Sequence, residues 1–142
     1  MFTITFIEEA FIEEKTIPFL QRLNPDTTEK VLKERLAEML KNNYKCIGVY
    51  NDEKLIGISG LWILVKHYIG KHVEPDNVII LPEYRGKGIG KQLVKWIIDY
   101  AISINGNSVE LNAYVASQEA NKFWTGQGFK PVGYHYQMKL TS

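Results

Sequence analysis

The sequence predicts a mixed α/β (α+β) fold, with a central, mostly antiparallel sheet of about six or seven strands flanked by about four helices. Strand-like runs and helical repeats alternate along the 142 residues, and no repeat, low-complexity tract or Pro/Gly/Ser linker divides them. A domain of this size removes roughly two thirds of its unfolded surface from water, so one core is enough. We therefore expect residues 1–142 to form a single domain.

The composition is that of an ordinary globular protein, with 45% hydrophobic and 23% charged residues. No segment approaches the about 20 uninterrupted apolar residues needed to span a bilayer. The segment from Met1 to Ile7 carries no basic residue ahead of its apolar part, so it resembles a first strand rather than an export signal. We therefore expect a cytoplasmic protein. The single cysteine, Cys46, lies among apolar neighbours, which favours a buried strand residue over a nucleophile.

The N-terminal part of the chain predicts one strand and two helical segments. Residues Phe2 to Ile7 alternate as a strand, and Glu8 to Leu23 is helical but interrupted at Pro18. Thr27 can cap a second helix, whose apolar residues recur at helical spacing as far as Leu40.

The next part of the chain predicts antiparallel strands. Two apolar runs, Lys45 to Tyr50 and Leu55 to Val65, are joined by four polar residues and form a hairpin. A turn near Gly70 leads into a further strand that ends at Leu81. Because Pro75 has no N–H to donate, regular pairing in that strand should be confined to residues 77–81.

The C-terminal part of the chain adds a long helix and two more strands. Apolar residues keep the helical period from Gly88 to Ile104, the strongest such signal in the sequence. Val109 to Tyr114 is a strand, a short helix capped by Ser117 follows, and Phe129 to Leu140 is a last strand. A strand, a long helix and a strand in succession imply a parallel pair, so the sheet is mixed.

The loop Arg85-Gly86-Lys87-Gly88-Ile89-Gly90 joins a strand to the start of the long helix. Glycines let the backbone approach an anion closely, and the free N–H groups at a helix start point toward it. The four residues Arg85, Lys87, Lys91 and Lys95 follow one another here with no acid among them. This pattern predicts a phosphate-binding turn in a protein of almost neutral charge, although for Lys95 a solvated helix face is the better interpretation.

The glycine spacing excludes two common phosphate loops. A dinucleotide fingerprint, G-x-G-x-x-G, would need a third glycine at position 91 or 93, where the chain has Lys91 and Leu93. A Walker loop would need Ser or Thr after Gly90-Lys91, where the chain has Gln92. The pattern that fits is Arg-x-x-Gly-x-Gly.

Two segments together resemble a known family. Val78 to Leu93 is similar to motif A of the GNAT superfamily of acyl-CoA-dependent N-acetyltransferases, and Ala120 to Phe129 resembles its motif B. The order and separation of the two segments also match. The resemblance implies acetyl-CoA as co-substrate, no metal, and a splayed parallel pair of strands at the coenzyme A site.

The resemblance also implies which residues bind coenzyme A. The backbone of the loop would hold the pyrophosphate, and the pantetheine arm would pair with the strand before it. The implied residues are Ile80, Leu81, Arg85, Gly86, Lys87, Gly88, Ile89, Gly90, Lys91, Ser117, Asn121 and Trp124. Ser117 stands where relatives often carry an Asn, and we favour a helix-capping role for it.

For catalysis, the resemblance implies that the N–H of Ile80 polarises the thioester carbonyl, as in an oxyanion hole. The acceptor amine must also lose a proton, and Asp76 lies four residues before Ile80, where some relatives carry a catalytic Glu. Glu74, His67 and His72 are alternatives for this base, although each histidine is better explained as a surface or hairpin residue. Three scattered histidines do not make a metal site.

The clearest departure from the family is Trp124, which stands where many relatives place a tyrosine that protonates the leaving thiolate. An indole N–H cannot serve as a general acid. Tyr114, Tyr134 and Tyr136 are alternatives, and each is also a candidate packing residue. A thiolate leaves readily near neutral pH, because its conjugate acid has a pKa of about 8.5, so the reaction does not require such an acid.

The function expected from this resemblance is acetylation of a small-molecule amine or a protein amine. An acidic cluster at Glu8, Glu9, Glu13 and Glu14 would suit a cationic acceptor, and a solvated helix face explains it equally well. A net charge of +1 does not favour binding to nucleic acid. No membrane partner is expected, and a homodimer is a hypothesis. A non-catalytic acyl-CoA-binding or regulatory module and a nucleotide-binding protein are the alternatives.

Overall fold

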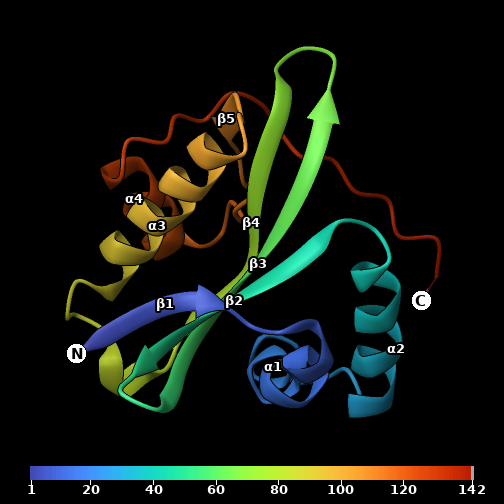
Figure 1. Ribbon diagram of the computed structural model, residues 1–142. Coiled ribbons are helices and arrows are strands. Elements are labelled where there is room, and N and C mark those ends of the chain that lie inside the picture. Colours follow the sequence, from blue (N-terminus) through green and yellow to red (C-terminus); the bar gives the residue numbers. More distant parts are fainter. Residues whose placement is uncertain (142) are drawn as a thin grey trace. The chain divides into compact units, whose positions relative to one another are not determined.

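The computed structural model describes residues 1–141, which fall into two compact units, Met1 to Leu111 and a second unit that begins at Asn112 (Figure 1). The first unit contains β1 (Phe2–Phe6), α1 (Glu9–Leu23), α2 (Glu29–Leu40), β2 (Tyr44–Asn51), β3 (Lys54–Lys66), β4 (Gly70–Ile80), the short 3₁₀ helix η1 (Pro82–Tyr84), α3 (Ile89–Ser103) and β5 (Ser108–Val109). The second unit contains α4 (Gln118–Gly126).

The strands of the first unit form one sheet in the order β1-β2-β3-β4-β5. The first four strands pair antiparallel, whereas β4 and β5 are parallel. The predicted mixed, mostly antiparallel sheet is therefore confirmed, but the described residues form five strands rather than six or seven. The parallel pair follows the crossover through α3, as the strand-helix-strand order predicted.

Helices cover both faces of this sheet (Figure 1). On one face, Phe6 of β1 packs edge-on against Trp96 and Tyr100 of α3, at ring-centroid distances of 5.2 and 5.1 Å. On the other face, Lys15 of α1 donates a hydrogen bond to the Tyr50 hydroxyl of β2 (3.3 Å). The core between the layers is made of aliphatic side chains from both the strands and the helices, among them Ile47, Val49, Ile56, Ile58, Leu61, Val73, Leu93 and Ile97.

The predicted interruption of the first helix at Pro18 is wrong, because α1 runs without a break from Glu9 to Leu23. A proline inside a helix removes one N–H, which would have bonded to the carbonyl of Glu14. Pro18 is exposed, whereas its neighbours Ile17 and Phe19 are buried. The freed carbonyl therefore lies on the solvent side, where water can satisfy it, and the buried side holds the helix together.

The predicted cap of α2 is shifted by one residue. Thr28, rather than Thr27, is the N-cap, and its hydroxyl accepts a hydrogen bond from the N–H of Val31 (3.3 Å). Either threonine could cap a helix with its hydroxyl. Because the first helical residue is Glu29, the residue before it, Thr28, is the N-cap. Among the described residues, no helix has both the length and the apolar character that crossing a membrane requires.

The prediction that Pro75 limits the pairing of β4 is also wrong. Strand β4 pairs with β3 on both sides of this residue, and Pro75 lies opposite Leu61. The carbonyls of Lys71 and Val73 accept hydrogen bonds from Asn107 and Glu110, on the β5 side. Since alternate residues of a strand direct their polar groups to the same side, Pro75 also faces away from β3, and its missing N–H costs no bond there.

A β-bulge follows directly after Pro75. Gly60 of β3 pairs with Asp76 and Ile58 pairs with Ile79, so one residue of β3 faces two residues of β4, Asn77 and Val78. Asn77 has φ +54°, in the left-handed region that asparagine tolerates better than most residues. The bulge changes which residues of β4 direct their backbone groups toward β3.

In the second unit, Ser117 caps α4 by accepting a hydrogen bond from the N–H of Ala120 (3.4 Å), which confirms its predicted capping role. Two predicted strands are wrong. The segment from Val109 to Tyr114 is a strand only in β5, and no strand forms between Phe129 and Leu140 in the part of the chain that the structure describes. Both segments have the alternating composition of strands, but alternation supplies no hydrogen-bond partner, and a strand needs one.

Tyr44 is buried on the face of the sheet that α1 covers, and Gly60 makes room for it. A Cβ atom at position 60 would overlap the hydroxyl and ring of Tyr44. The Tyr44 ring packs against Trp62 (centroids 4.6 Å apart), and its hydroxyl accepts a hydrogen bond from the side chain of Asn77 (3.1 Å). Tyr44 therefore links β2, β3 and the bulge of β4.

We predict that Gly60→Ala lowers the free energy of unfolding by about 1–3 kcal/mol, because Tyr44 must move out of a packed site. Chemical denaturation of the variant and the wild type measures this difference. Gly133→Ala is the matched control, since a Cβ there would meet no atom of the described residues within 4 Å, and it should change the stability by less than about 0.5 kcal/mol. Equal stability of the two variants would contradict the role assigned to Tyr44.

Candidate active site

The loop between η1 and α3 depends on two glycines. Gly86 and Gly88 have φ values of +75° and +76°, in the left-handed region, where a side chain would cost about 1–2 kcal/mol per residue. A Cβ at either position would meet no atom of the described residues within 4 Å. The backbone of the loop therefore faces open space, in which a ligand can approach it closely.

The helix that follows has free N–H groups at its start. Gly88 is the N-cap of α3, a helix of 15 residues, and no side chain of the described residues caps it. The first helical bond runs from the N–H of Gln92 to the carbonyl of Gly88 (3.2 Å), so the N–H groups of Ile89, Gly90 and Lys91 point out of the helix. The helix dipole places partial positive charge at the same point.

Exposed basic side chains surround this helix start, and the first turn of α3 contains no acid. Arg85, Lys87 and Lys91 are all exposed. The guanidinium of Arg85 donates a hydrogen bond to the carbonyl of Ile80 (3.4 Å), so this side chain also ties the loop to the end of β4. Lys95, one turn further along, forms an ion pair with Asp99 (2.6 Å), as its interpretation as a solvated residue implied.

The end of β4 has an open edge on the side away from β3. The N–H of Leu81 donates to the carbonyl of Ile56 on β3 (2.9 Å), so the polar groups of the preceding residue, Ile80, point to the opposite side. On that side β5 pairs with His72 and Val73 only, among the residues of the first unit. The N–H of Ile80 therefore points away from β3, at the end of β4 that leads into the glycine loop.

Asp76 lies just before the bulge, with both carboxylate oxygens engaged. One oxygen accepts a hydrogen bond from the indole N–H of Trp62 and the other from the backbone N–H of Asn77, each at 2.9 Å. The side chain is exposed and shares a face of β4 with His72 and Glu74, because alternate residues of a strand point to the same face. Asp76 is thus a fixed, solvent-accessible carboxylate beside the open edge.

Sequence reasoning did not identify the ionisable cluster at the other end of β4. The imidazole of His72 lies between two carboxylates, with Nε2 3.5 Å from Glu74 and Nδ1 3.7 Å from Glu110. Glu110 also accepts hydrogen bonds from the hydroxyls of Tyr68 (2.7 Å) and Ser108 (2.8 Å). The parallel register of His72 and Ser108 brings these residues together, and only long-range pairing, which the sequence does not reveal, could have predicted it.

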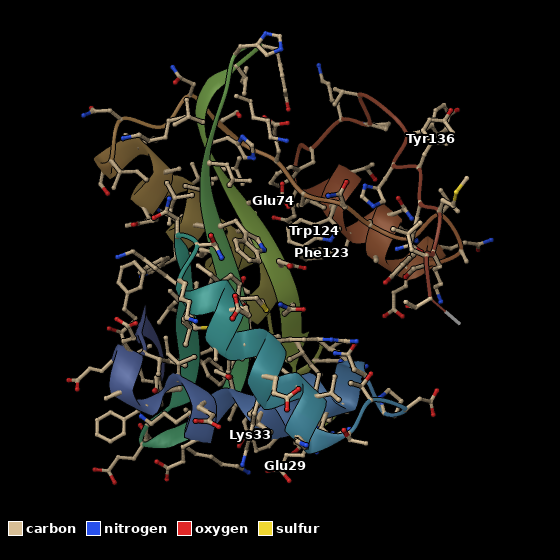
Figure 2. All side chains as sticks on the ribbon, turned by 90° about the vertical axis from the view of Figure 1, so that its right-hand side faces the viewer. Glu29, Lys33, Glu74, Phe123, Trp124 and Tyr136 are labelled. Carbon is tan, nitrogen blue, oxygen red and sulfur yellow. The ribbon has the colours of Figure 1, made fainter. Side chains whose placement is uncertain are left out.

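Two of the acidic residues near the N-terminus, Glu13 and Glu14, lie beside α2. Glu13 and Glu14 line an open groove of about 510 Å³ between α1 and α2, together with Glu29 and Lys33. Glu29 and Lys33 form an ion pair (3.2 Å) within α2. Figure 2 shows Glu74 near the middle of the view, apart from Glu29 and Lys33 at its lower end.

The predicted site residues of the second unit make local contacts. The side-chain amide of Asn121 donates to the carbonyls of Tyr114 (2.9 Å) and Ser117 (2.7 Å). Trp124 packs edge-on between Phe123 and Phe129, at centroid distances of 5.0 and 5.4 Å. Tyr114 is 87% exposed. Within residues 1–141, no group of three or more His, Cys, Asp or Glu side chains is arranged to hold a metal ion.

A glycine loop with an uncapped helix start, beside a strand with an open edge, is suited to a phosphorylated ligand with an extended arm. The family comparison identifies the class of protein. The acetyltransferase (GNAT) family matches residues 5–129, so the chain belongs to that family of acyltransferases. The predicted family membership is confirmed.

Several sequence relatives are named as N-acetyltransferases. An uncharacterized N-acetyltransferase of Halalkalibacterium halodurans is 30% identical over 93 residues, covering 61% of this chain and 50% of that protein. A putative [ribosomal protein bS18]-alanine N-acetyltransferase of Bacillus subtilis is 26% identical over 97 residues, covering 68% of this chain and 61% of that protein. The chain thus matches about half to three fifths of the length of these two relatives.

Solved structures show the same fold at low identity. An aminoglycoside N-acetyltransferase, AAC(6')-Iy, in complex with a bisubstrate analogue has a TM-score of 0.84 and 14% identity, covering 100% of this chain and 99% of that one. The glucosamine-6-phosphate N-acetyltransferase of Arabidopsis thaliana has a TM-score of 0.74 and 19% identity, covering 99% of both chains. The predicted fold class is confirmed.

Cys46 is not a nucleophile of this site. The residue is 1% exposed, and burial raises the pKa of its thiol to about 11 despite a hydrogen bond with Tyr44 that lowers it. The pKa of Tyr44 itself is raised well above its ordinary value, chiefly by burial. Both groups therefore stay protonated near neutral pH and act as packing residues, as the sequence predicted for Cys46.

We predict that Cys46 in the folded protein resists thiol reagents. At about pH 8 only about one thousandth of this thiol is ionised, and the reagent has no access to it. An aromatic disulfide reagent, whose release is followed by absorbance, should react with the native protein at least about 100 times more slowly than with protein in concentrated guanidinium chloride. Comparable rates in the two states would show that Cys46 is accessible.

Proposed function

We propose that this protein transfers an acetyl group from acetyl-CoA to a primary amine by direct attack of the amine on the thioester. The observation that carries the proposal is the left-handed glycine loop at the uncapped start of α3, next to the open edge of β4. A pyrophosphate suits the first feature, since it is anionic and compact. An amide-containing arm suits the second, because its amides can bond to free strand groups.

Several residues of the loop would contact coenzyme A. The backbone from Gly86 to Lys91 faces the pyrophosphate, with charge from Arg85, Lys87 and Lys91. The arm runs beside Ile80 and Leu81. We also assign contacts with coenzyme A to Ser117, Asn121 and Trp124 of the second unit, on the strength of their match to motif B of the family.

Acetyl transfer then needs three steps. The acceptor ammonium gives one proton to Asp76, the neutral amine nitrogen then forms a bond to the thioester carbon, and the carbon–sulfur bond breaks as the nitrogen loses its second proton to water. The N–H of Ile80 stabilises the negative charge that develops on the carbonyl oxygen; such donors are typically worth about 10² to 10³ in rate. The sulfur leaves as a thiolate, which takes a proton from the hydroxyl of Tyr114 or from water.

The acceptor is a primary amine. Among the relatives, one is named for an alanine of a ribosomal protein and one is named an aminoalkylphosphonate N-acetyltransferase, which are a protein amine and a small-molecule amine. Asp76 and Glu74 give the open edge of β4 a negative potential, which favours an acceptor that arrives as an ammonium ion.

We predict that Lys91→Gln weakens coenzyme A binding about two- to fivefold, because it removes a cation from the first turn of α3. Isothermal titration calorimetry at low salt measures the Kd. Lys95→Gln is the matched control, since Lys95 lies one turn away and is paired with Asp99, and it should leave the Kd unchanged. Tighter binding of ATP or NAD than of coenzyme A would contradict the proposal at its first step.

We predict that Asp76→Asn lowers kcat roughly 100-fold at neutral pH with little change in coenzyme A affinity, since the amide keeps the shape but accepts no proton. The measurement is thiol release from acetyl-CoA over a panel of amines. Tyr114→Phe, tested beside it, should lower kcat much less, because a thiolate leaves without an acid. Tight coenzyme A binding without turnover on any amine would favour a non-catalytic acyl-CoA-binding module instead.

A further inference from the structure

Trp62 of β3 contacts Asp76 of β4, although the two residues are not direct partners in the sheet. Glu74 lies opposite Trp62, and Asp76 follows two residues later on the same face. Diagonal neighbours on such a face are about 7–8 Å apart, which an aromatic side chain can span. Gly60, the direct partner of Asp76, has no side chain. The indole of Trp62 crosses the diagonal and donates a hydrogen bond from Nε1 to Oδ2 of Asp76 (2.9 Å).

The carboxylate of Asp76 is held from two directions. The second donor is the backbone N–H of Asn77, which bonds to Oδ1 (2.9 Å). One hydrogen bond at each oxygen restricts both torsions of a side chain that is otherwise exposed to solvent. An ionised carboxylate has about four lone-pair sites, so about two remain for a further donor. Asp76 can therefore receive an ammonium group without giving up either bond.

The indole of Trp62 is itself fixed by packing. Its ring lies against that of Tyr44, with centroids 4.6 Å apart, and Tyr44 is only 4% exposed. The Tyr44 hydroxyl accepts a hydrogen bond from the side chain of Asn77 (3.1 Å). The contacts thus form a closed ring of four residues, Tyr44, Trp62, Asp76 and Asn77. Because each member is held on two sides, the carboxylate has a defined position on the strand.

The indole suits this position because it takes no part in the proton transfer itself. It has one N–H donor and no acceptor, so it does not compete with Asp76 for the proton of an ammonium group. The orientation of a catalytic group matters for the rate, since a misplacement of about 1 Å can cost about 100-fold. A fixed donor on Oδ2 therefore has a direct effect on what Asp76 can do.

We propose that Trp62 is a positioning residue for acetyl transfer, which holds the carboxylate of Asp76 in the orientation that receives the acceptor ammonium. This inference rests on the proposed function and on Asp76 as its base. In this role Trp62 acts only through its hydrogen bond to Oδ2, and the remaining lone pairs of the carboxylate are left for the acceptor.

The test removes the donor and keeps an aromatic ring, in the variant Trp62→Phe. We expect kcat for an amine acceptor to fall about tenfold, while the KM for acetyl-CoA and the Kd of coenzyme A stay within about twofold, since the glycine loop is untouched. The unchanged Kd also shows that the variant is folded. Trp96→Phe is the matched control, because Trp96 packs against Phe6 and Tyr100 and loses the same volume. It should keep kcat within about twofold of the wild type.

A double-mutant cycle separates positioning from general packing. If Trp62 acts through Asp76, Trp62→Phe should lower kcat about tenfold in the wild type and less than about twofold in Asp76→Asn, where the base is already lost. A residue that only supports the fold would lower kcat by the same factor in both backgrounds. Equal factors, or wild-type kcat in Trp62→Phe, would overturn the proposal.

Nitrogen–proton NMR checks the contact without any turnover. The indole signal of Trp62, identified by its loss in Trp62→Phe, should move in Asp76→Asn, because the charged acceptor of its hydrogen bond becomes neutral. An unmoved signal would refute the contact. A wild type that acetylates no amine overturns the proposed function, and this role with it, whereas an active wild type beside an equally active Trp62→Phe overturns the role of Trp62 alone.

Discussion

The bulge at Asn77 and Val78 places one extra residue in β4 and reverses the alternation of its backbone groups relative to β3. Upstream of the bulge, Val73 turns its carbonyl toward β5, whereas downstream Leu81 bonds to β3 and leaves Ile80 facing outward. The short β5 covers the upstream part only, within the first unit. The orientation of Ile80 away from β3 depends on this one irregularity.

The surroundings of the bulge hold it in place from the side of β3. Asn77 donates to Tyr44, Trp62 donates to Asp76, and Gly60 leaves the space that Tyr44 fills. These contacts come from two strands that carry no predicted site residue. Because a strained asparagine at φ +54° needs such support, the packing of β2 and β3 determines the geometry of β4.

Local patterns predicted well what depends on local chemistry. The glycine spacing of the loop, the long helix after it and the strand-helix-strand order were all readable from the sequence, because turns and helices are stabilised by neighbours in the chain. The effect of Pro75 was predicted wrongly, since it depends on which side of the strand its nitrogen faces. The continuity of α1 through Pro18 and the His72 cluster likewise depend on burial or on distant residues, whereas the cap of α2 at Thr28 follows from where that helix begins. The roles of Asp76, Ile80 and Tyr114 stay predictions.

The donors at the start of α3 are main-chain N–H groups, and this has a consequence for how such a chain diverges. Replacing the side chain at position 87 or 89 leaves these donors in place, so only the residues in the left-handed conformation, Gly86 and Gly88, are restricted by backbone geometry. The remaining loop positions can change while the main-chain donors persist. The fold itself is retained at low identity, since two solved structures with TM-scores of 0.74 and 0.84 share 19% and 14% of their residues with this chain.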